Sequence, residues 1–200
     1  MHTTTRPRFL PWALAFGIAR AGDIWSTGLF MLQPGGEQGE MNPLTSIFGL
    51  SYWPLITINV LVSAIVVYGH WHYYRHFGER SISGSPRGPM EYQSLLFFGR
   101  PDRTWQLLFT VQRNNTTFHA QHAHILLKAI TCVSVLAVLH NCGQVYDWPV
   151  NDFLRQVLIR PSLVYYGLMV PLAYWTYWRM AEREFQYQIL RSSDIPPQRR

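Results

Sequence analysis

Two long stretches of the chain, residues 44–74 and 161–178, contain no aspartate, glutamate, lysine or arginine. An α-helix of roughly 20 apolar residues crosses the hydrocarbon core of a bilayer, and a charge-free run of about 18 or more residues is typical of such a helix. The sequence is 48% hydrophobic and 15% aromatic but only 14% charged, which also indicates a membrane protein. We therefore predict membrane spans over residues 52–74 and 161–179.

Two further segments are long and apolar but carry charges. Residues 9–32 contain Arg20 and Asp23, and residues 123–142 contain Lys128. Both have the length of a span, and neighbouring helices are able to satisfy their polar groups. The predicted fold is therefore all-α: a single membrane domain built as a bundle of four transmembrane helices.

The largest segment predicted to lie outside the membrane is the loop of residues 77–118, between the second and third spans. Its second half mixes apolar residues such as Trp105 with Arg100 and Arg103. Such an amphipathic segment is expected to lie on the membrane surface or against another subunit. A tail, residues 180–200, follows the fourth span, and the helix of that span is expected to continue into it to about Leu190.

Arginine is unevenly distributed among the segments outside the predicted spans. The N-terminal arm, the long loop and the C-terminal tail are rich in arginine, whereas the other two loops carry most of the acidic residues found between spans. Because Lys and Arg are retained in cytoplasmic segments, both termini and the long loop are predicted to be cytoplasmic. The net charge of +6 then follows from topology, and no nucleic-acid partner is predicted.

Charged and polar residues in the first span follow one face of the predicted helix. Arg20, Asp23 and Thr27 recur at three- and four-residue intervals, so this stripe is expected to face protein rather than lipid. Ionisable groups in a membrane span need a partner, and they are candidates for function. On a neighbouring stripe, Gly17 and Ala21 form a pair of small residues that predicts a close helix approach.

The outer halves of the first two spans are predicted to share a polar cluster. The helical rise places Asp23 about 14 Å and Asn59 about 12 Å below the outer ends of their spans, so the two side chains can meet. Glu40 and Asn42 lie just before the second span, and His140 lies near the outer end of the third. The predicted cluster consists of Arg20, Asp23, Thr27, Glu40, Asn42 and Asn59. Asp23, Glu40 and His140 are its candidate catalytic or ion-binding groups, and helix packing with capping by Asn42 is the alternative.

One motif in this region resembles a known family. Asp23-x3-Thr27 is followed, after twelve residues, by Glu40-x-Asn42-Pro43. This pattern resembles an uncharacterised bacterial family of small polytopic membrane proteins, which is recognised by an Asp, a Thr and a Glu-x-Asn-Pro turn between its first two helices. The resemblance covers residues 19–74. It implies a multi-pass protein of the bacterial inner membrane, and it implies no activity because the function of that family is unknown.

Six of the eight histidines lie at the predicted cytoplasmic boundary of the second and third spans. They are His70, His72, His76, His119, His122 and His124. Imidazoles from facing helices are able to bind a transition metal or to ligate haem or a chlorin. Histidines mixed with tryptophan and tyrosine also form an ordinary headgroup belt, and the spacing matches no specific metal motif.

No common catalytic motif, such as GxSxG, HExxH or a Walker loop, occurs in the sequence. The leading hypothesis is therefore a non-enzymatic accessory or scaffold subunit that packs against other membrane proteins and binds lipids. The first alternative is a membrane-embedded enzyme or an ion- or proton-handling protein that uses the outer polar cluster. The second alternative is a haem- or chlorin-binding subunit of an electron-transfer or photosynthetic complex.

Overall fold

The computed structural model of the chain describes residues 8–33, 45, 48–79, 82–108, 110, 112, 115–149 and 161–193. Within these residues all the regular structure is helical, which confirms the predicted all-α class. The elements are α1 (Phe9–Met31), α4 (Tyr52–Arg75), α5 (Pro89–Phe98), the short 3-10 helix η1 (Thr104–Leu108), α6 (Thr116–Val145) and α8 (Pro161–Ser193).

The first two long helices agree with the predicted segments, and the last two extend beyond their predicted spans. α6 begins at Thr116, ahead of the predicted span, because Asn115 caps it: its Oδ1 accepts a hydrogen bond of 3.1 Å from the backbone N–H of Phe118. α8 continues through Pro171 and beyond residue 179 to Ser193. The prediction that the fourth helix continues beyond its span to about Leu190 is therefore confirmed.

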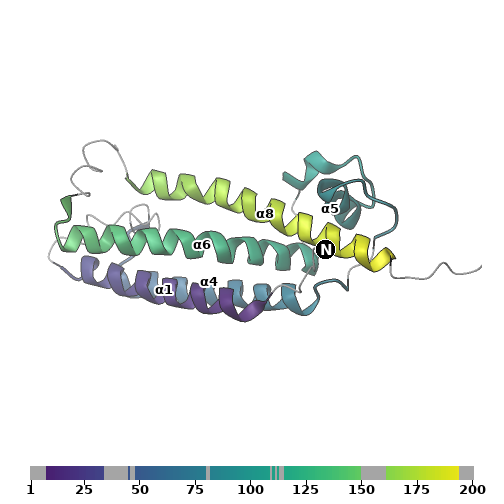
Figure 1. Cartoon of the computed structure of the whole chain (residues 1–200). Coiled ribbons are helices and arrows are strands. Elements are labelled where there is room, and N and C mark those ends of the chain that lie inside the picture. The colour runs from purple at the N-terminus through teal and green to yellow at the C-terminus, as the bar shows by residue number, and fades with distance from the viewer. Residues whose placement is uncertain are drawn as a thin grey trace, which may run out of the picture.

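The four long helices lie side by side, with α6 packed against α1, α4 and α8 (Figure 1). α1 and α6 run in one direction, and α4 and α8 run in the other. The start of α1, the end of α4, the start of α6 and the end of α8 therefore share one end of the molecule, which we call the inner end. The opposite end is the outer end.

The helices approach one another most closely at particular glycines. A Cβ atom at position 69 would lie 2.5 Å from the Cβ of Ala123, so α4 can pack this closely against α6 only with glycine there. A Cβ at position 28 would lie 2.7 Å from the hydroxyl of Tyr52. The close approach that Gly17 would allow is not made within the described part of the chain, because nothing there lies within 4 Å of the position of its Cβ.

Apolar side chains fill the space between the four long helices, and other apolar side chains cover the outward faces of these helices. Phe16, Val66 and Leu127 pack together in the interior. On the outward faces, large apolar residues are well exposed, including Ile18, Trp53, Ile65 and Val170 at 70 to 74%. Among the described helices, α4 and α6 are long and apolar enough to cross a membrane.

The long loop folds back onto its own chain at the inner end. α5 lies beside the C-terminal part of α8 (Figure 1), and Tyr92, Gln93 and Ser94 of α5 are buried. α5 ends at Gly99, whose φ of 66° is the left-handed conformation that favours glycine at a helix end. One partner of this predicted amphipathic segment is therefore α8 of the same molecule.

Candidate functional site

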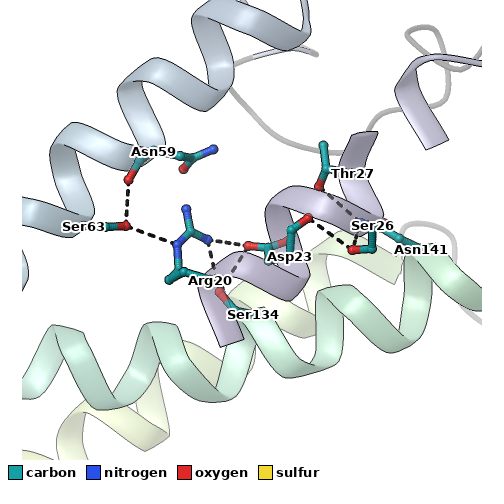
Figure 2. Close-up of polar contacts among 8 residues, drawn as sticks. All are labelled: Arg20, Asp23, Ser26, Thr27, Asn59, Ser63, Ser134 and Asn141. Carbon is teal, nitrogen blue, oxygen red and sulfur yellow. Dashed lines mark hydrogen bonds and ion pairs between the residues drawn. The ribbon is translucent and has the colours of Figure 1, made fainter. Parts of the chain in front are cut away.

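Arg20 is the centre of a buried polar network that joins three helices (Figure 2). Its guanidinium forms an ion pair with Asp23, one turn further along α1. It also donates from Nε to Ser63 of α4 at 3.3 Å and from Nη1 to Ser134 of α6 at 3.1 Å. The side chains of Arg20 and Asp23 are only 13% and 17% exposed, so their charges are offset mainly by protein groups.

The hydroxyl groups in this network act as both donors and acceptors. Ser134 accepts from Arg20 and donates to Oδ2 of Asp23 at 3.1 Å. Ser63 accepts from Arg20 and donates to the backbone carbonyl of Asn59 at 2.7 Å. Each of these two hydroxyls therefore has an acceptor for its proton and a donor for its oxygen.

The network continues toward the outer end through Asn141 of α6. The Nδ2 atom of Asn141 donates to Ser26 at 3.2 Å and to Thr27 at 3.3 Å. Ser26 in turn donates to the backbone carbonyl of Asp23 at 3.1 Å. Polar side chains therefore hold α1 against α6 over about two turns of each helix.

The structure brings together only part of the polar cluster predicted from the sequence. Arg20, Asp23 and Thr27 lie in the network, and Asn59 enters it through its backbone carbonyl. No contact reaches the side-chain amide of Asn59 in Figure 2. Glu40 and Asn42 lie outside the described residues.

His140, the third candidate catalytic residue, is buried on α6 and directed to its own helix. Its Nε2 lies 2.7 Å from Nε2 of Gln144, one turn further along. The contact from this part of α6 to the network is made instead by the neighbouring residue Asn141. In the described part of the chain, Asp23 and His140 are therefore not joined by any of the hydrogen bonds that build the network.

Four contributors to the network, Ser26, Ser63, Ser134 and Asn141, were not among the predicted site residues. Serines are common in apolar helices, and none of these three serines has a sequence feature that marks it as part of the network. The position of two of them was a signal: Ser63 lies four residues, about one helical turn, after Asn59 in the second predicted span, and Asn141 directly follows His140. Whether Ser134, the one serine of α6, meets the ion pair depends on the register between α1 and α6, and tertiary packing sets this register.

A second group of buried polar residues lies at the inner end, where α4 meets α6. His70 and His124 are 0% and 2% exposed, and their Nδ1 atoms lie 3.2 Å apart. One of these nitrogens must carry a proton and the other must accept it. The two rings stack at a centroid distance of 5.0 Å and an angle of 10°, with Tyr73 stacked on His124 at 4.3 Å.

This geometry excludes the arrangement in which His70 and His124 together ligate one haem or chlorin. Axial ligation by two histidines requires the macrocycle to lie between the rings, whereas the His70 and His124 nitrogens are in hydrogen-bond contact. The other four histidines do not join this buried pair. His72 and His76 contact each other on α4, His76 pairs with Glu79, His119 is exposed, and His122 contacts the carbonyl of Phe118. The described residues contain no group of three or more His, Cys, Asp or Glu placed to hold a metal ion.

A third buried polar cluster fastens α5 to the long helices. Oε2 of Glu184, on α8, accepts from Gln93 of α5 at 3.0 Å and from Gln121 of α6 at 2.8 Å. All three side chains are at most 4% exposed. This cluster was not predicted, because glutamine and glutamate in arginine-rich segments resemble ordinary solvated residues.

No protein-family model, curated protein or solved structure matches this chain. The resemblance to the uncharacterised bacterial family therefore stays a prediction. The assignment of function must come from the arrangement of the residues themselves.

Proposed function

We propose that the chain is a non-enzymatic integral protein of the bacterial inner membrane, and that it works as an accessory or scaffold subunit of a larger membrane complex. In this proposal α1, α4, α6 and α8 each cross the bilayer, and the inner end is cytoplasmic. Even the shortest of them, α1 with 23 residues, is about 34 Å long, which is enough for a hydrocarbon core of about 30 Å.

The distribution of apolar and polar groups supports a lipid environment. Burying a large apolar side chain is favourable by about 1.5 to 3 kcal/mol, so the exposed outward faces of the four helices would be costly in water. The charged pair Arg20–Asp23, by contrast, lies inside between helices. In lipid, where ionised groups need protein partners, this is the expected arrangement.

The positions of the arginine residues support the proposed orientation, in which the inner end is cytoplasmic. Arg75, Arg100, Arg103 and Arg183 all belong to segments at the inner end or connected to it. Cytoplasmic segments retain such residues, and both described termini of the chain lie at this end. The inner end is therefore assigned to the cytoplasm.

The hydrogen bonds and the ion pair that engage Arg20, Asp23, Ser63 and Ser134 with one another are the observation that best supports a non-enzymatic role. The Asp23 carboxylate is engaged by Arg20 and Ser134, and the hydroxyls of Ser63 and Ser134 are each used as donor and acceptor. A catalytic base needs free access to the proton that it removes. A network whose members satisfy one another is instead suited to fixing the register of α1, α4 and α6.

The contact with other subunits is assigned to the cytoplasmic segment. Trp105, in η1, is 61% exposed although it lies outside the proposed membrane spans. Tryptophan is enriched among the residues that contribute most to protein–protein binding. The buried cluster around Glu184 supports α5, which packs on η1, so Trp105 projects from an ordered part of the chain.

Extraction of the native membranes in a mild detergent tests this function. The expected result is a particle larger than the monomer, with other membrane proteins in it, for the unchanged chain. Trp105→Ala is expected to release the chain as a free monomer. Trp53→Ala, which removes an exposed tryptophan at the outer end, is the matched control and is expected to leave the particle intact.

Two results would contradict the proposal. One is a free monomer for the unchanged chain in every mild detergent. The other is an intact particle with Trp105→Ala, which would remove the assigned contact surface.

A further inference from the structure

A cavity of about 210 Å³ lies toward the inner end, where it is lined by residues of α1, α4, α6 and α8. Tyr73 of α4 and His124 of α6, from the buried histidine group, form part of its lining. The residues that matter here are Trp12 of α1, Lys128 and Cys132 of α6, and Trp175, Arg179 and Arg183 of α8. The cavity belongs to neither the Arg20 network nor the Glu184 cluster.

The charge of this cavity is strongly positive. Lys128, Arg179 and Arg183 line it, and none of its described lining residues is acidic. Arg179 pairs with Glu182 at 3.2 Å, and the positive charges of Lys128 and Arg183 repel each other. Glu184, the nearest other carboxylate along α8, is held by Gln93 and Gln121. An anion between Lys128 and Arg183 would therefore remove an unfavourable interaction.

An apolar stripe leads from this cavity toward the outer end. Cys132, Val135 and Leu139 follow Lys128 along α6 at four-, three- and four-residue intervals, so they share its face. Cys132 is exposed, Val135 is 47% exposed and Leu139 is 51% exposed. A positive pocket therefore continues into an uncovered apolar stripe on the same helix.

The aromatic residues place the cavity at the level of lipid headgroups. Trp12 and Trp175 are 37% and 62% exposed, and the Lys128 amine lies 4.9 Å from the centre of the Trp12 ring. Tryptophan is enriched where a membrane protein passes from hydrocarbon to headgroups. Basic residues at this level attract anionic lipids.

We infer that the cavity and the stripe bind one anionic phospholipid, with its phosphate between Lys128 and Arg183 and an acyl chain along Cys132, Val135 and Leu139. The inference rests on the proposed membrane location of the four helices. The acyl chain covers the stripe, and the phosphate offsets the two basic groups.

Binding of dansyl-labelled phosphatidylglycerol to the full chain in mild detergent tests the inference, with tryptophan-to-dansyl energy transfer as the signal. The native chain is expected to bind this lipid more tightly than dansyl-labelled phosphatidylcholine. Lys128→Gln combined with Arg183→Gln is expected to weaken binding roughly thirtyfold, from about 1 kcal/mol for each basic residue. Arg75→Gln is the matched control, because Arg75 also sits by a tryptophan, 5.0 Å from the ring centre of Trp71, but on α4.

Two further measurements distinguish binding of the headgroup from binding of the acyl chain. Cys132→Trp fills the stripe while the charges remain, and it is expected to weaken lipid binding. Inorganic phosphate at millimolar concentration is expected not to displace the lipid. Displacement by phosphate would overturn the inference in favour of a site for free anions, and equal binding of the two lipids would overturn it outright. Equal weakening by Arg75→Gln would do the same.

Carbonate extraction of the membranes that contain the chain tests the proposed membrane spans independently of the lipid site. If the chain stays in the membrane pellet and the Lys128 and Arg183 variants bind lipid normally, only the lipid site is overturned. If carbonate releases the chain, the proposed membrane spans fail as well. The thermal melting curve of each variant verifies that it is folded when its binding is measured.

Discussion

At the scale of single residues, the chain places two opposite charges inside a set of apolar helices and satisfies them locally. Arg20 reaches Asp23 on its own helix and serines on two others. Removal of one charge from a buried pair leaves the other without compensation, and this costs more than the pair itself contributes. The network is therefore expected to stabilise the arrangement of α1, α4 and α6 only while it is complete.

Asp23→Ala is expected to destabilise the protein by about 3 to 5 kcal/mol, because it leaves the Arg20 guanidinium buried without its carboxylate. Ser134→Ala removes one hydroxyl that bonds both groups, and a loss of about 1 to 3 kcal/mol is expected. Denaturation of the purified protein in detergent measures both changes.

The combination Asp23→Leu with Arg20→Leu is the control for this effect. Both charges are then absent, so the double variant is expected to be more stable than Asp23→Ala alone. A double variant that is as unstable as the single one would contradict the account of an uncompensated charge.

At the scale of helices, glycines decide where two elements can approach. Gly69 allows contact with Ala123, and this contact lies next to the stacked pair His70 and His124. Gly17 looked equally suited to a helix contact in the sequence, yet no described atom lies within 4 Å of the position of its Cβ. A small residue permits a close approach, but only the packing of the neighbouring helix determines whether it is used.

Gly69→Val and Gly17→Val form a matched pair that tests this contact. Valine at position 69 would collide with Ala123 and is expected to destabilise the protein by about 1 to 3 kcal/mol. A Cβ at position 17 meets no described atom within 4 Å, so valine there is expected to have little effect beyond helix propensity. Thermal melting in detergent compares the two. Equal destabilisation would show that helix propensity, rather than the contact with Ala123, is responsible.

At the scale of the whole molecule, the positions of the helices were easier to predict from the sequence than the side-chain contacts between helices. Charge-free apolar runs and the stripe of Arg20, Asp23 and Thr27 are local patterns, and the long helices follow them. The serines that contact Arg20 and the glutamines that contact Glu184 lie far from them in the sequence. Nothing in the sequence around these serines and glutamines indicates the contacts. The six inner histidines looked like one group, yet only His70 and His124 form the buried pair, because helix rotation turns the others outward.

We propose that four helices cross the bilayer with the inner end in the cytoplasm. Labelling of single cysteines with a membrane-impermeant maleimide tests this topology, after Cys132→Ser and Cys142→Ser remove the native thiols. In intact spheroplasts, Gln33→Cys and Asp147→Cys, at the outer end, are expected to react, and Asp102→Cys is expected to react only after permeabilisation. Labelling of Asp102→Cys in intact spheroplasts, or protection of either outer position, would contradict the four-span arrangement.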